Sequence, residues 1–154
     1  MRNNKKDLQA AKDYAFLLLK FRPRSYKELS QRLKKKRFEE QVINSVLEFL
    51  SQNKFIDDNE FAGAWIKSRL KRNLGPRRII EELKAKGINK QIIDSQLRQL
   101  TKDYCQEEIV FGLARSRISK LKGVDPQKAK ARVYAFLLRR GFSGGVIMDA
   151  IKSL

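Results

Sequence analysis

The chain has 154 residues, with 35 Lys or Arg against 17 Asp or Glu and a formal net charge of +18 at pH 7. It contains one cysteine and no histidine, which excludes an internal disulfide and a Cys–His dyad and leaves few ways to hold zinc. Its longest apolar run, residues 14–19, is too short to cross a bilayer, and no signal-peptide cleavage site follows it. The composition predicts a cytoplasmic protein with no membrane partner, whose charge favours polyanions.

The first helix is expected over residues 7–21, because the residue before Pro23 avoids the helical region. A capping box then opens a second helix: Ser25 can accept a hydrogen bond from the amide of Glu28, and the Glu28 carboxylate can reach back. A third helix is expected to begin near Glu39, where acidic side chains suit the positive end of the helix dipole.

The same plan recurs further along the chain. Asp57 is expected to cap the next helix, and Gly75 followed by proline indicates the end of that helix and the start of another. Asn89 is expected to cap the third helix of this copy. No segment shows the alternation of a β-strand.

The last third of the chain contains three more predicted helices. A long helix is expected over residues 102–120, Asp125 with the following proline is expected to cap the second, and Ser143 to cap the third, which runs through residue 151.

Apolar positions confirm that these segments are copies of one unit. Seven positions are apolar in all three copies, at constant spacing within each: Leu29, Leu33, Phe38, Val42, Ile43, Leu47 and Leu50; Ile79, Leu83, Ile88, Ile92, Ile93, Leu97 and Leu100; Val133, Leu137, Phe142, Val146, Ile147, Ile151 and Leu154. A period of this length indicates supersecondary units that stack around a shared core. The predicted fold is all-α, with three tandem three-helix repeats over residues 1–57, 58–103 and 104–154, stacked into an elongated array of helices at right angles.

Basic side chains gather in short clusters along all three copies: Lys34–Arg37, Arg69 with Lys71 and Arg72, Arg77-Arg78, Arg115 with Arg117, Lys120 with Lys122, and Arg139-Arg140. They can form a ridge that faces phosphates or acidic side chains. An alternative holds for Lys36, Lys86 and Arg140, which occupy equivalent positions and could simply complement the negative end of a helix dipole.

Other candidate groups have simpler explanations. Asp57 and Asp58 could form a carboxylate pair, but a helix cap explains them better. Phe61 and Trp65 could stack on bases, but their helical spacing favours the core. Further side chains expected in the core are Tyr14, Phe16, Phe21, Leu138 and, as a small hydrophobe, Cys105.

Several motifs in a fixed order resemble the RecX family, regulators of the bacterial recombinase RecA. They are Arg24-Ser25 with Glu28-Leu29, Phe55–Asp58 followed by Phe61-Ala62, Gly75-Pro76 with Glu82-Leu83 and Lys86–Ile88, and Tyr134–Leu137 with Arg139–Phe142. The resemblance covers roughly residues 10–154. One departure is Lys36-Arg37-Phe38, where the family usually has Lys-Gly-Phe, so Arg37 would be strained if this position needs a positive φ.

The resemblance implies an elongated, curved molecule that lies in the groove of the RecA–DNA filament and usually damps its ATPase, recombinase and coprotease activities, within homologous recombination, DNA repair and the SOS response. The chain is expected to be a monomer. It could also contact single-stranded DNA in the filament. The residues expected to contact RecA or DNA are Lys34, Lys35, Arg69, Arg72, Arg77, Arg78, Arg115, Arg117, Arg139 and Arg140.

Catalysis has little support in the sequence. Neither a phosphate-binding glycine loop nor a nucleophile elbow is present, and acidic residues are scarce. No catalytic residue, cofactor or metal ligand is therefore predicted. Two alternatives stay open: a stand-alone helical nucleic-acid-binding protein that uses the same charges, and a nuclease with a carboxylate-only magnesium site.

Overall fold

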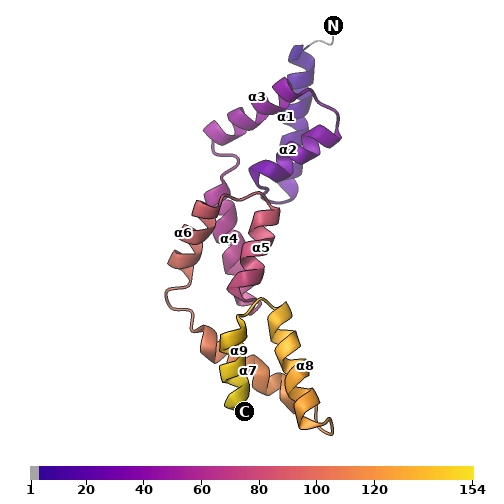
Figure 1. Cartoon of the computed structure of the whole chain (residues 1–154). Helices are drawn as coiled ribbons and strands as arrows, with labels where there is room; N and C mark the ends of the chain where they lie inside the picture. Colours follow the sequence, from indigo (N-terminus) through magenta and orange to yellow (C-terminus); the bar gives the residue numbers. More distant parts are fainter. Residues whose placement is uncertain (1–3) are drawn as a thin grey trace. The chain divides into compact units, whose positions relative to one another are not determined.

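The structure is a computed structural model that describes residues 4–154, and in that range it contains helices and connecting turns but no strand, which confirms the all-α prediction (Figure 1). Its helices are α1 (Asn4–Phe21), α2 (Tyr26–Lys35), α3 (Glu40–Gln52), α4 (Asp58–Lys71), α5 (Pro76–Ala85), α6 (Lys90–Leu100), α7 (Gln106–Ser119), α8 (Pro126–Arg139) and α9 (Gly144–Lys152). None of these described helices is both long and apolar enough to cross a membrane.

The helices belong to two compact units. The first contains the chain up to Ala64 together with Leu83–Ile93, and the second contains Trp65–Glu82 together with Asp94–Leu154. The division falls within α4, α5 and α6, so each unit contains part of the middle repeat.

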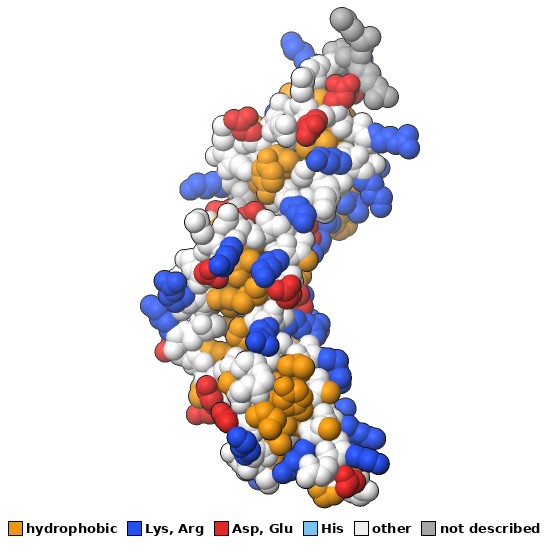
Figure 2. Space-filling view, viewed as in Figure 1, with side chains coloured by type: hydrophobic (Ala, Val, Ile, Leu, Met, Phe, Trp, Pro, Cys, Tyr) orange, Lys and Arg blue, Asp and Glu red, His pale blue; other side chains and the backbone are white. Residues whose placement is uncertain are grey.

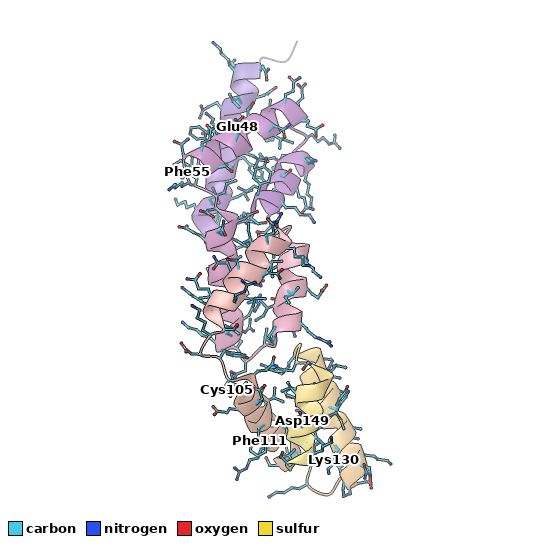
Figure 3. All side chains as sticks on the ribbon, turned by 60° about the vertical axis from the view of Figure 1, so that its left-hand side comes forward. Glu48, Phe55, Cys105, Phe111, Lys130 and Asp149 are labelled. Atoms are coloured by element: carbon cyan, nitrogen blue, oxygen red, sulfur yellow. The ribbon has the colours of Figure 1, made fainter. Side chains whose placement is uncertain are left out.

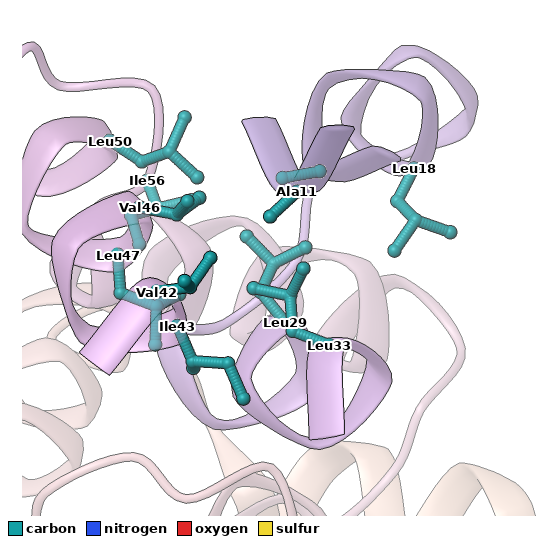
Figure 4. Packing of buried hydrophobic residues seen from close by; sticks show 11 residues of the cluster. Ala11, Leu18, Leu29, Leu33, Val42, Ile43, Val46, Leu47, Leu50 and Ile56 are labelled. Carbon is teal, nitrogen blue, oxygen red and sulfur yellow. The ribbon is translucent and has the colours of Figure 1, made fainter. Parts of the chain in front are cut away.

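The core of the first unit forms where α1, α2 and α3 pack on one another. Leu29 and Leu33 of α2 are fully buried and lie beside Ile43 of α3 and Ala11 of α1 (Figure 4). These are the positions that the repeat pattern marks as apolar, and burial of each leucine contributes about 2 kcal/mol through the hydrophobic effect.

The second unit has an equivalent core where α7 packs against α8 and α9. Val133 and Leu137 of α8, Phe142 in the following turn and Ile147 of α9 are all fully buried. The same apolar spacing therefore builds a three-helix core in both places.

Local sequence signals also place most helix starts correctly. At α2 both bonds of the capping box are present, from the Glu28 amide to Ser25 Oγ (3.2 Å) and from the Ser25 amide to Glu28 Oε2 (3.1 Å). Asp57, Asn89 and Asp125 accept backbone amides with their side chains, as expected. These short-range interactions are readable from sequence because both partners lie within three residues.

Four predictions about helix ends need correction. Helix α1 begins at Asn4, three residues before the predicted start at residue 7. The long helix predicted from residue 102 begins only at Gln106, because a turn follows α6, in which Thr101 Oγ1 donates to Leu97 O. Ser143 has the extended N-cap backbone, but its side chain makes no capping hydrogen bond. The residue that ends α4 with a positive φ (53°) is Asn73, whereas Gly75 precedes α5.

Several side chains predicted to be buried are exposed. Phe21 is 77% exposed because it is the last residue of α1, and Leu138 follows Leu137 on α8, so it points about 100° away from the core. Leu154 lies beyond the end of α9 and is also exposed. Cys105 is exposed as well, because it is the N-cap residue of α7 (Figure 3).

Arg37 has a positive φ (64°), so the backbone strain expected of a non-glycine residue at this position is present. The equivalent residues in the other two repeats are Gly87 (φ 77°) and Gly141 (φ 94°). The Arg37 side chain is exposed, so this position combines a left-handed backbone with an exposed side chain.

Candidate anion-binding pocket

Lys and Arg side chains occur along the visible face in Figure 2, with hydrophobic and acidic side chains and other surface between them. Four of the ten predicted contact residues come together in the second unit, where they line one pocket of about 170 Å³. The lining residues are Arg69, Arg72, Leu74, Arg78, Glu82 and Arg140. We call this the arginine pocket.

Glu82 is the acid that holds one side of the arginine pocket together. Its Oε2 accepts from Arg69 Nε (2.5 Å) and Trp65 Nε1 (2.9 Å), and its Oε1 accepts from Arg78 Nε (3.1 Å). Burial acts to raise the pKa of Glu82, but the hydrogen bonds from Arg69, Arg78 and Trp65 outweigh it and leave the pKa lowered. Glu82 is therefore an ionised carboxylate at neutral pH.

Trp65 contributes to the site through this network. It is half-buried, and the guanidinium of Arg69 lies 4.0 Å from its ring centre. A cation above an aromatic ring is attracted by the ring's quadrupole. Phe61, one turn earlier on α4, is buried as predicted (7% exposed). Both aromatic side chains are thus engaged within the protein.

Arg140 also lines the arginine pocket. As the C-cap residue of α8 it donates from Nε to the Asn73 carbonyl (3.1 Å) and from Nη2 to the Arg72 carbonyl. Those two carbonyls follow the end of α4, where oxygens lack helical partners. Arg140 therefore joins the third repeat to the second. This role goes beyond the alternative considered from sequence, in which it only complements the dipole of its own helix.

The balance of charge in the pocket is strongly positive. Four arginines and one glutamate line the pocket, and the carboxylate of that glutamate is shared between Arg69 and Arg78. Arg72 extends from the exposed loop after α4, while Arg140 binds neutral carbonyl oxygens. A site of this composition can accept an anion through several charge-assisted hydrogen bonds.

The structure does not bring the other six predicted residues into this pocket. Lys34 and Lys35 lie exposed in the last turn of α2, in the first unit. The remaining four are exposed in the second unit: Arg77 at the start of α5, Arg115 and Arg117 on α7, and Arg139 at the end of α8. The guanidinium of Arg117 lies 5.0 Å from the centre of the Phe136 ring, so it packs against an aromatic side chain of the protein.

Sequence reasoning missed Glu82 and Leu74 as parts of the site. One signal for Glu82 was available, since it lies four residues after Arg78 on the same helix, the spacing of a surface ion pair. Within residues 4–154 no cluster of three His, Cys, Asp or Glu side chains could hold a metal ion.

Tandem three-helix domains joined through charged side chains define this chain as a helical repeat protein. Models of the first, second and third three-helix domains of RecX match residues 11–50, 57–97 and 106–151, so the chain belongs to the RecX family. This confirms the resemblance seen in the motifs.

Individual relatives agree with the family models. The chain is 32% identical to the regulatory protein RecX of Amycolatopsis mediterranei over 143 residues, 92% of this chain and 81% of the relative. It is 33% identical to that of Chlorobium limicola over 142 residues, 92% and 87% of the two chains. The crystal structure of RecX from Lactobacillus salivarius has the same fold, with a TM-score of 0.84, 24% identity and 97% of each chain covered.

Proposed function

We propose that this chain regulates the RecA recombinase by binding in the groove of the RecA–DNA filament, and that it inhibits the filament's ATPase, recombinase and coprotease activities. Membership of the RecX family supports regulation of RecA. The structural observation that carries the binding step is the arginine pocket, which is lined by four arginines and one glutamate.

The proposed mechanism is binding without catalysis. A filament presents phosphates and acidic side chains, and basic residues on successive repeats can contact several of them at once. A monomer of the chain in the cytosol, with repeats over residues 1–57, 58–103 and 104–154, would bridge neighbouring protomers and oppose the movements that accompany ATP turnover. The ten basic residues predicted from sequence are the proposed contacts.

The test adds purified protein to RecA filaments on single-stranded DNA and follows ATP hydrolysis and strand exchange. Inhibition is expected, and Arg72→Glu is expected to raise the half-inhibitory concentration about tenfold, the effect of losing one desolvated charge contact of about 1.4 kcal/mol. Arg132→Glu is the matched control, because this exposed arginine of α8 lies outside the pocket lining. Unchanged rates at saturating protein would refute the proposal.

A second candidate is a stand-alone nucleic-acid-binding protein, which the net charge of +18 favours. It predicts affinity for bare DNA that falls with salt, with a log–log slope of about −0.7 to −0.9 per phosphate contacted. Tight binding to bare DNA with no added affinity for the filament would support it. Magnesium-dependent DNA cleavage by the purified chain would instead contradict a mechanism by binding alone.

A further inference from the structure

In both compact units, a hydrogen bond connects consecutive repeats at corresponding positions. We call each of these contacts a joint. At the first joint, Ser25 Oγ, just before α2, donates to the carbonyl of Lys86 at the end of α5 (2.6 Å). At the second joint, the amide of Gly75, just before α5, donates to the carbonyl of Arg140 at the end of α8 (2.8 Å). In both cases the start of a repeat's second helix meets the end of the next repeat's second helix.

Both joints are tightly closed. A Cβ placed on Gly87 would lie 2.4 Å from Cδ of Lys27, and one on Gly141 would lie 2.4 Å from Cβ of Arg78. Separations this short are far below van der Waals contact, so each joint leaves room only for glycine. The two joints can therefore be compared residue by residue.

The first joint contains one carboxylate, Glu28, in contact with two basic side chains. Lys86 Nζ contacts Glu28 Oε1 at 2.5 Å, and Arg22 Nη2 contacts the same oxygen at 3.0 Å. Burial acts to raise the pKa of Glu28, but these partners and the Ser25 amide lower it to about 2. The Glu28 side chain is 12% exposed, so its charge is held inside the joint.

The second joint has the opposite charge at the corresponding place. The repeat spacing puts Arg78 where the first joint has Glu28, and Arg140 where it has Lys86. Two guanidiniums thus replace an ion pair. Glu82, one turn further along α5, contacts Arg78 and Arg69, whereas Arg140 donates to two carbonyl oxygens.

We propose that the arginine pocket binds a phosphate group, which supplies to the second joint the negative charge that Glu28 supplies to the first and so stiffens it. Arginines line the pocket from α4, the loop after it, α5 and the end of α8. The tetrahedral oxygens of a phosphate can accept from several such directions at once, whereas the two oxygens of a carboxylate lie in one plane. The inference shares residues with the proposed function but is tested without any recombinase, so the two can fail separately.

The direct test measures amide hydrogen exchange by NMR on the full chain, with and without inorganic pyrophosphate at constant ionic strength. The amides of Gly75 and Arg77 report on the second joint, because they donate to Arg140 O and Gly141 O. At a pyrophosphate concentration ten times Kd, their exchange is expected to slow about tenfold. The amide of Ile88, beside the first joint, is expected not to respond. Equal exchange in pyrophosphate and in chloride would overturn the proposal.

Two variants separate a built site from general charge screening. Arg72→Gln removes one guanidinium from an exposed loop, so it is expected to weaken the pyrophosphate response at Gly75 several-fold. The control Arg132→Gln removes the same charge from the exposed face of α8 and is expected to keep the response. An equal loss in both variants would contradict a specific pocket.

Arg78→Glu tests the comparison between joints, because it gives the second joint the acid of the first. The expected result is slow exchange at Gly75 without pyrophosphate and no further slowing when pyrophosphate is added. A full response in this variant would overturn the proposal.

A single-stranded oligonucleotide that protects Gly75 at lower concentration than pyrophosphate assigns the phosphate to a nucleic-acid backbone, and equal protection assigns it to free phosphates. Stronger protection by an acidic peptide than by either would overturn phosphate in favour of a protein carboxylate.

Discussion

Gly141→Ala is expected to destabilise the second unit far more than Gly123→Ala, although both glycines have positive φ (94° and 84°). At Gly123 a new Cβ would meet no heavy atom within 4 Å, so only the left-handed backbone opposes it, at a cost of about 1 kcal/mol. At Gly141 the Cβ would also lie 2.4 Å from Cβ of Arg78 and 2.5 Å from its backbone nitrogen. Backbone atoms cannot rotate away, so overpacking adds about 1–3 kcal/mol.

The assay is urea denaturation of the full chain followed by circular dichroism. Gly112→Ala is the third member of the series, because it lies exposed within α7 with no heavy atom within 4 Å of a new Cβ. It is expected to stabilise the protein by about 1 kcal/mol through helix propensity. If Gly141→Ala and Gly123→Ala differ by less than about 0.5 kcal/mol, the close approach at the second joint is not what constrains residue 141.

Three further outcomes test the packing and electrostatics. Leu33→Ala is expected to lower the free energy of unfolding by about 2–5 kcal/mol, measured in urea, because it leaves a cavity between α2 and its neighbours. Ser25→Ala removes both a cap and the bond to the Lys86 carbonyl, so a loss of about 1–3 kcal/mol is expected, and a loss below about 0.5 kcal/mol would count against that bond. The lowered pKa of Glu28 (about 2, from 4.5) contributes stability that is complete above about pH 4.5 and lost as the pH falls towards 2. After discounting for solvent screening we expect about 1–2 kcal/mol, obtained as the difference between the pH profiles of the unmodified chain and Glu28→Gln. The raised pKa of Asp58 comes mainly from burial and acts in the opposite direction in both proteins, while the smaller part of it that comes from the Glu28 charge is lost in the variant and belongs to the measured difference.

The parts of the fold that sequence predicts are those decided by nearby residues. The capping box at Ser25 and the apolar stripe through Leu29 and Leu33 depend on spacings of three or four residues, and the structure has both. Phe21 shows the limit of such reasoning. It fits an apolar helix face, but it lies at the last position of α1, where no helix covers it.

The arginine pocket could not be predicted as a unit, because its members are far apart in the chain. Arg72 and Arg140 are 68 residues apart and meet only where α8 ends beside the loop after α4. Charge alone identifies both as candidate contact residues. What charge could not show is which of the ten candidates share a carboxylate, as Arg69 and Arg78 do.

Each joint has two halves: the residue before the second helix of one repeat, and the glycine after the second helix of the next repeat. These halves decide how this chain could be lengthened. Only the middle repeat, among the described residues, carries both halves: Gly75 ahead of its second helix and Gly87 behind it. A duplicated middle repeat would therefore find a matching partner on each side, whereas Arg37 denies the first repeat that option as an inserted module. Every such insertion would also set Arg78 of one copy against Lys86 of the next, so a longer chain would gain, per added module, one more joint with basic residues at both of these positions. Growth by tandem duplication would thus add places for anions at the same rate as it adds length.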